Sequence, residues 1–255
     1  LLNYLWPLLI VLFSSLLPAS ALAALVVIML YVAVAKLFWR RSLGETVIGA
    51  LAAGQVNSNN IGIPISLYLL GNAAYPAPVI LLQLIAFTPI SLTLLDLATS
   101  DKGSSIWKIL GRTATNPVVI GSVAGTLVSV SGITLPPIVM EPMNLIAGAC
   151  IPVLLISYGL SLHGTRVLSR HGRRRDVLLA STLKLVIMPL AGWAVAEFVF
   201  QLPPHEVLII VVLALLPTAQ NVFNYSQRYD VGENISRDTI FITTIGCVPL
   251  LLLAT

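Results

Sequence analysis

The stretch "QVNSNNIGIP", residues 55–64, places five polar side chains within its first six positions, in the middle of an apolar segment. It follows "GALAAG" at residues 49–54 and precedes "ISLYLL" at residues 65–70. A buried amide group is costly unless it finds a hydrogen-bond partner. A chain that places amides here must therefore supply partners for them, and the nature of these partners decides the fold.

The composition of the 255-residue chain is typical of a membrane protein. Hydrophobic residues make up 57% of it and charged residues 9%, whereas about 25% of the residues in a soluble domain are charged. A transmembrane β-barrel would need segments of alternating hydrophobicity. Runs such as "ALAALVVIMLYVAVAKLFW" do not alternate and are long enough to cross a bilayer as helices. The composition therefore predicts an all-α polytopic membrane protein.

Eight membrane-spanning segments are expected after a short apolar start. Residues 4–17 are too few for a comfortable span and lack the basic region of a signal peptide. We interpret them as the end of a span that begins outside this chain. The later spans are predicted at residues 19–39, 46–70, 77–97, 117–131, 136–162, 177–199, 206–226 and 237–254.

The basic residues alternate between the loops. Of the 14 Lys and Arg residues, only Lys184 does not lie in or beside one set of loops, which includes "TRVLSRHGRRRD" at residues 165–176. The other loops, "GNAAYP", "SGITLPP" and "FQLPPHE", contain no Lys or Arg. The positive-inside rule then places the basic loops in the cytoplasm and the C-terminus outside, and the expected location is the plasma (inner) membrane. The net charge of +4 is explained by topology, so no nucleic-acid partner is expected.

Two of the predicted spans, residues 46–70 and 206–226, have the same interruption. Each has a glutamine ahead of two asparagines spaced three apart, and each has a nearby proline, which removes a backbone donor and breaks a helix. The residues are Gln55, Asn57, Asn60 and Pro64 in the first span, and Gln220, Asn221, Asn224 and Pro217 in the second.

The loop charges make these two spans run in opposite directions. Paired interruptions in segments of opposite direction are typical of transporters with inverted repeats, and irregular backbone at membrane depth needs a protein interior or a wet cavity. The simpler alternative is that the amides form hydrogen bonds between helices, each worth about 1 kcal/mol. The doubled pattern favours a binding site with alternating access.

Several motifs, in this order, resemble the auxin efflux carrier family, which includes plant auxin exporters and bacterial carboxylate carriers. They are "VNSNNIGIPI", "NPVVIGSVAG", "CIPVLLISYGLSL", "LKLVIMPLAG" and "LLPTAQNVFNYSQRYD". The resemblance implies two inverted repeats of five spans, with the fourth and ninth spans crossing as broken helices. Residues 1–97 would form the first repeat, N-terminally incomplete here, residues 98–116 a cytoplasmic linker, and residues 117–255 the second repeat. Val56 and Asn59 depart from the family pattern, in which proline and glycine are usual.

The candidate substrate-binding residues come from the two interruptions and their neighbours. They are Asn57, Asn60, Gln83, Lys184, Thr218, Gln220 and Asn221, with Pro64 and Pro217 expected to enforce the helix breaks. Gln83 is included because the family has an acidic or amide side chain near this place. Lys184 lies about 10 Å into its span, where a lysine attracts an anion, replaces a coupling cation, or extends its charge to the membrane surface.

The expected function is a secondary transporter or facilitator of small organic anions, namely carboxylates including auxin-like acids. The alternative is a membrane scaffold or sensor with a vestigial carrier fold and no transport. No catalytic constellation or phosphate-binding loop is recognised, so an enzyme is not expected. Cys150 and Cys247 lie in apolar stretches and the three histidines are far apart, so neither a metal nor a cofactor is expected. The expected partners are the anion and the lipid bilayer; coupling to Na⁺ or H⁺ and a homodimer are left open.

Overall fold

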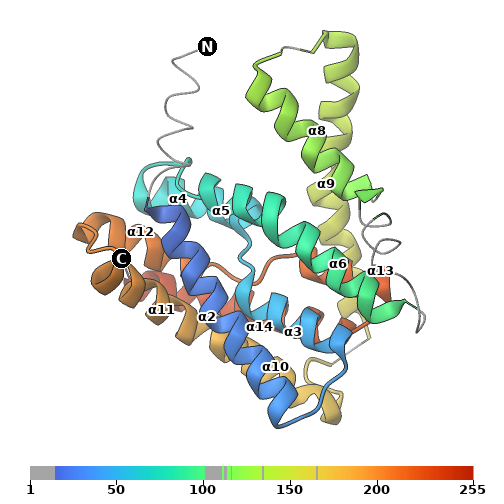
Figure 1. Cartoon of the computed structure of the whole chain (residues 1–255), viewed down its shortest axis with the longest axis vertical. Coiled ribbons are helices and arrows are strands. Elements are labelled where there is room, and N and C mark those ends of the chain that lie inside the picture. Colours follow the sequence, from blue (N-terminus) through green and yellow to red (C-terminus); the bar gives the residue numbers. More distant parts are fainter. Residues whose placement is uncertain are drawn as a thin grey trace.

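The computed structural model describes residues 15–100, 111, 114–115, 117–133, 135–164 and 166–254. Every regular element in these ranges is a helix (Figure 1). Four of the described helices are long and apolar enough to cross a membrane: Leu16–Leu37, Ala77–Thr99, His171–Val199 and Glu233–Ala254. The prediction of an all-α polytopic membrane protein is therefore confirmed. Most of the expected start at residues 4–17, and most of the expected linker at residues 98–116, lie outside the described residues.

The helices follow one another in a simple order, with several π-helical turns between α-helices. The elements are α2 (Leu16–Leu37), α3 (Leu43–Gly54), η1 (Ser58–Gly62), α4 (Ile63–Leu70), α5 (Ala77–Leu82), η2 (Gln83–Phe87), α6 (Thr88–Thr99), α8 (Pro117–Ser131), α9 (Pro137–Leu162), η3 (His171–Arg173), α10 (Arg174–Thr182), η4 (Leu183–Ile187), α11 (Met188–Ala194), η5 (Val195–Val199), α12 (Pro204–Leu215), α13 (Asn221–Tyr229) and α14 (Glu233–Ala254).

Three of the π-helical turns have the same local cause. The turns η1, η2 and η4 each end two residues before a proline, namely Pro64, Pro89 and Pro189. A proline within a helix has no N–H to donate, and its ring crowds the carbonyl four residues earlier. A wider turn just before the proline relieves this crowding without ending the helix. Proline in this chain therefore does not always mark a helix break.

The two ends of the bundle differ in chemistry. At one end, Arg41 forms an ion pair with the buried Asp176 at 2.7 Å between Nη2 and Oδ2, and Arg173 pairs with Glu45. At the other end, the rings of Tyr75 and His205 stack edge to face, with 6.1 Å between their centroids. The two predicted basic loops that contain Arg41 and Arg173 thus meet at one end of the bundle. The two loops that contain Tyr75 and His205, and lack Lys and Arg, meet at the other end.

The packing of α2 on α3 places the first interruption inside the bundle. The two helices approach closely at Gly49, where an added Cβ would lie 2.0 Å from the Tyr31 hydroxyl oxygen. That hydroxyl donates a hydrogen bond to Asp176 Oδ1 at 3.3 Å. Because α3 ends five residues after Gly49, this contact fixes where the interrupted backbone begins.

The helices α8 and α9 extend away from the other helices (Figure 1). The described attachment of α9 is near its C-terminal end, where the Tyr158 hydroxyl donates to the carbonyl of Arg237 at 2.9 Å. The ring of Tyr158 also stacks edge to face on Phe223, with 5.4 Å between the centroids. The core that holds the two interruptions is therefore formed by the other helices.

Candidate functional site at two helix breaks

The first break is a short extended segment between α3 and η1. Helix α3 ends at Gly54, and Gln55 is extended, with φ −88° and ψ 136°. Helical backbone resumes at Ser58, where the Asn57 side chain accepts a hydrogen bond from the Asn60 N–H at 3.3 Å. Pro64 lies seven residues after Asn57, within the helical turns that follow the break. Pro64 thus lies after this break and not in it, where the π-helical turn η1 accommodates the proline within helical backbone.

The second break lies between α12 and α13 and does contain its proline. Helix α12 ends at Leu215, and Leu216 is extended, with φ −55° and ψ 144°. Pro217 follows directly, and helical backbone resumes at Asn221. The chain therefore crosses the interior without regular structure from Leu216 to Gln220.

The two breaks cross and supply each other with hydrogen bonds. The Asn57 N–H donates to the Pro217 carbonyl at 2.8 Å, and the Ala219 N–H donates to the Gln55 carbonyl at 3.1 Å. Val56 and Thr218 face each other as an isolated antiparallel bridge. Each break thus satisfies backbone groups that the other leaves free, as buried backbone requires. The predicted crossing of two broken helices is confirmed.

A cavity of about 300 Å³ lies beside the crossing. Its volume is at the lower end of the range for small-molecule sites. The lining residues come from both breaks, from the π-helical turn η2 and from the adjoining helices α5 and α6. They are Gln55, Val56, Asn57, Ser58, Asn59, Asn60, Ile80, Gln83, Leu84, Thr88, Ala219, Gln220 and Asn221. We call this the amide cavity.

Five of the seven predicted binding residues line the amide cavity: Asn57, Asn60, Gln83, Gln220 and Asn221. The structure does not bring Thr218 and Lys184 to it. Thr218 is fully buried and donates from Oγ1 to the Ala52 carbonyl at 2.7 Å. Lys184 is also fully buried, and its Nζ donates to the Ala214 carbonyl at 2.9 Å. The alternative in which Lys184 extends to the membrane surface is therefore wrong.

Four polar residues that line the cavity were not among the candidates from the sequence: Gln55, Ser58, Asn59 and Thr88. The Ser58 hydroxyl accepts a hydrogen bond from Gln83 Nε2 at 2.6 Å. Thr88 Oγ1 bonds to the Gln83 carbonyl at 2.9 Å and lies 3.2 Å from the Tyr225 hydroxyl. Gln55 had a usable signal in the sequence, because it precedes the first asparagine of its break, as Gln220 does in the other.

Two amide groups in the cavity wall have unused donors. Gln55 is 2% exposed and Gln220 is 6% exposed. The Nε2 atoms of both are buried to less than 1 Å² of exposed surface and have no hydrogen-bond partner among the described residues. Since a buried donor without a partner costs about 1–3 kcal/mol, a rotation of either amide toward an acceptor in the cavity would be favourable.

The charge around the cavity comes from backbone dipoles. None of the residues that line it is Lys, Arg, His, Asp or Glu. Helix α13 begins at Asn221 and the helical run of η1 and α4 begins at Ser58, so both run away from the cavity. The N-terminal end of a helix has partial positive charge and free N–H groups. The cavity thus favours a negative group without containing a formal cation.

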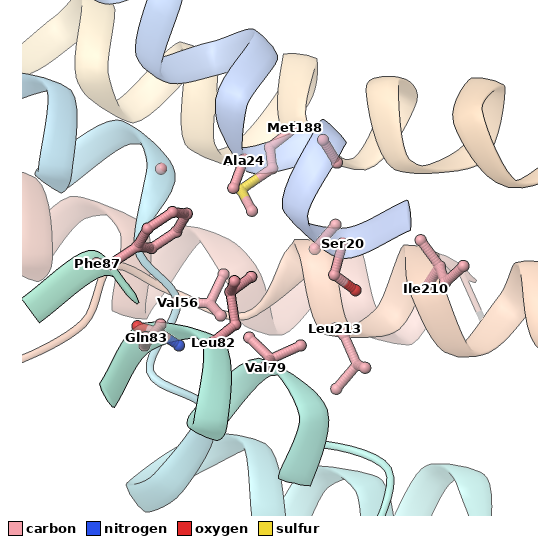
Figure 2. Close-up of a pocket in the computed structure, with 13 residues that line it drawn as sticks. Ser20, Ala24, Val56, Val79, Leu82, Gln83, Phe87, Met188, Ile210 and Leu213 are labelled. Carbon is pink, nitrogen blue, oxygen red and sulfur yellow. The ribbon is translucent and has the colours of Figure 1, made fainter. Parts of the chain in front are cut away.

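A smaller apolar cavity lies on the other side of Val56 and Gln83, which line both spaces. Figure 2 shows these two side chains with Ala24, Met188 and Leu213 around it. Its volume of about 20 Å³ is roughly the space of one water molecule. It has no room for an organic ligand, so the amide cavity is the candidate binding site.

Crossing helix breaks around a polar cavity, in a bundle of membrane-spanning helices, are typical of transporters with discontinuous helices. A family model described as membrane transport protein matches residues 7–255. The chain belongs to this family, the auxin efflux carrier-like transporters, as its motifs indicated. It is also 27% identical over 225 residues to a protein of Rhizobium meliloti (strain 1021) named "Putative malonate transporter"; the match covers 86% of this chain and 69% of that protein.

Proposed function

We propose that this protein carries small organic anions with a carboxylate group across the plasma membrane by alternating access. The observation that supports this most directly is the amide cavity, whose wall includes Gln55 and Gln220, each with a buried Nε2 that has no partner among the described residues. A carboxylate has two oxygens and about four acceptor positions, so it can accept from both amides. The helix N-termini beside the cavity stabilise its charge.

The similarity to a protein whose name includes malonate suggests that dicarboxylates belong among the compounds to test. Because no cationic side chain lines the cavity, the neutral amides and helix ends would bind one carboxylate group. The second would need the remaining amides, such as Asn60 and Asn221, or water. Malonate and a monocarboxylate of similar size are therefore the informative pair of substrates.

The proposal includes an orientation in the membrane. The end with Arg41 and Arg173 would face the cytoplasm and the end with Tyr75 and His205 would face outside, because short loops rich in Lys and Arg stay inside. A cysteine placed at Asn72 should react with an impermeant maleimide added to intact cells. A cysteine at Gly172 should react only after the membrane is permeabilised, and the reverse pattern would contradict the orientation.

Transport is tested with the whole protein in vesicles, by uptake of labelled malonate and of a labelled monocarboxylate. Gln220→Glu keeps the shape of the side chain but adds a negative charge to the cavity, so uptake should fall to background. Gln227→Glu makes the same chemical change at an exposed position of α13 and should leave uptake unchanged. Asn57→Ala and Asn221→Ala should each lower uptake about tenfold, the loss expected for one hydrogen bond to a charged group.

Two outcomes would contradict the proposal. Unchanged uptake in both the Asn57→Ala and the Asn221→Ala variants, at equal expression, would remove the amide cavity as the site. If the unaltered protein neither bound nor moved any carboxylate, transport of this class would be excluded, and the scaffold or sensor alternative would be favoured.

A further inference from the structure

The carbonyl of Ala214 has an unusual partner. In an unbroken helix this carbonyl would accept from the N–H of the residue four positions later, Thr218. The break at Leu216 turns that N–H away, and it donates to Thr243 Oγ1 at 3.1 Å. The Lys184 ammonium takes its place on the Ala214 carbonyl, at 2.9 Å. A side chain from a neighbouring helix thus repairs the broken end of α12.

This repair brings a charge into the interior of the membrane protein. Lys184 is fully buried, and it forms no ion pair among the described residues. Its other contact is Met188 Sδ at 3.0 Å, and a thioether is a weak acceptor. A lysine in such a place is costly. The C-terminal end of α12, which has partial negative charge, lies beside its ammonium and offsets part of this cost.

The corresponding carbonyl at the other break has a neutral partner. Ala52 lies two residues before the end of α3 and accepts from the Thr218 hydroxyl at 2.7 Å. A hydroxyl therefore suffices to satisfy a freed carbonyl at this depth. The ammonium on Ala214 must then have a role that hydrogen bonding alone does not explain.

We propose that Lys184 is a resident cation that occupies the place of a bound Na⁺ at the broken end of α12, so that the crossing keeps its shape without a coupling metal ion. In transporters with discontinuous helices, C-terminal helix ends and freed carbonyls hold such cations. Hard cations bind carbonyl and hydroxyl oxygens. Ser181, about one turn before Lys184, is buried, and its hydroxyl has no partner among the residues that the structure describes. Lys184 is a positioning residue, since it touches α12 and not the amide cavity.

The first test measures thermal unfolding of the purified protein in detergent and does not depend on transport. Lys184→Ala removes the ammonium and leaves space. Its melting temperature should be lower than that of the unaltered protein and should be partly restored by Na⁺, Li⁺ or methylammonium, but not by choline at equal ionic strength. The unaltered protein should melt at one temperature in all four salts. Lys36→Ala is the matched control, because Lys36 also donates to a carbonyl, that of Arg41 at 3.1 Å, but is exposed.

A lack of any cation effect on Lys184→Ala, or an equal effect on the unaltered protein, would overturn the proposal. If Lys184→Ala does not fold, Lys184→Met preserves the volume and is used for the second test. The unaltered protein alone also tests the idea, because a Na⁺-dependent melting temperature in it would contradict a resident cation.

The second test measures malonate uptake by vesicles when Na⁺ is replaced by choline. Uptake by the unaltered protein should not change, and Lys184→Met should lower it about tenfold or more, the loss of a hydrogen bond from a charged group. Uptake that requires Na⁺ would overturn the proposal. So would proton movement that is coupled to uptake and lost in Lys184→Met, since Lys184 would then change its charge in each cycle. An inactive unaltered protein contradicts the proposed function alone, because the melting experiment still decides the role of Lys184.

Discussion

The two helix breaks are similar where they face the amide cavity and different where they are held in the protein. At the cavity, Gln55 and Gln220 both line the wall, and each has a buried Nε2 without a partner among the described residues. Away from the cavity, the end of α3 is satisfied by a neutral hydroxyl and the end of α12 by the buried ammonium of Lys184. The matched part, which is the pair of glutamines, binds a ligand in our proposal. The unmatched part, which is the pair of helix ends, is satisfied in two different ways within the protein.

The difference begins with the position of the prolines. Pro217 lies in the extended part of its break, so α12 loses a backbone donor at the point where it ends. Pro64 lies in helical backbone after its break and is accommodated by η1. The first break is therefore caused less by proline than by the contacts that stabilise extended backbone at Gln55. These are the hydrogen bonds exchanged with Pro217 and Ala219.

The largest effect is expected when the matched part is removed. The double variant Gln55→Leu with Gln220→Leu should lower carboxylate uptake about 100-fold, which corresponds to the loss of two hydrogen bonds to a charged group. The free energy of unfolding should not fall, because neither Nε2 has a partner to lose in the part of the chain that the structure describes. Uptake in vesicles and unfolding in detergent measure the two quantities.

A loss of stability that parallels the loss of uptake would show that the glutamines have a structural role instead. Gln227→Leu, at an exposed position of α13, is the matched control and should change neither quantity.

The second largest effect is expected when the tie between the breaks is cut. Thr218→Val removes the hydroxyl that donates to the Ala52 carbonyl and leaves this buried carbonyl without its partner. The free energy of unfolding should fall by about 1–3 kcal/mol. Thr99→Val is the control, because the Thr99 hydroxyl bonds to Leu95 in its own helix at 2.9 Å, and it should cost less than about 1 kcal/mol. Equal losses in the two variants would contradict a special role for the crossing.

Much of this arrangement could be predicted from the sequence, and what could not was non-local. Clusters of amides near prolines located both breaks, since irregular backbone in a membrane needs polar partners. The partners themselves depend on contacts between distant segments. Thr218 bonds to a residue 166 positions away, and Lys184 to one 30 positions away, and their sequence neighbours give no sign of this. Both were predicted to contact the ligand. A polar residue in a span can either bind a ligand or form a hydrogen bond to another helix, and only the packing distinguishes these two roles.

A third, intermediate effect should separate the two prolines. Pro217→Ala returns an N–H to the second residue after α12, which removes the helix-interior penalty of about 3 kcal/mol that proline imposes. Continuation of α12 as a helix then competes with the extended backbone of Leu216. If about half of this energy favours the continued helix over the break, uptake should fall about tenfold. Pro64→Ala should leave uptake unchanged, because helical backbone already surrounds this position. A larger loss for Pro64→Ala would contradict the assignment of the breaks.

The smallest effect concerns the residue at which the two breaks differ most. Counting from the first asparagine of each break, Asn59 and Phe223 hold the same place, and Asn59 is exposed whereas Phe223 is buried against Tyr158. The Asn59 amide donates to Asn60 Oδ1 at 3.2 Å, so its role toward a ligand would be to orient Asn60. An exposed hydrogen bond of this kind contributes about 0.5 kcal/mol, the lower end of the usual range. Asn59→Ala should therefore lower uptake by about threefold or less, and Asn60→Ala by more. A greater loss for Asn59→Ala would mean that Asn59 itself contacts the substrate, and that the first break supplies more of the binding site than the second.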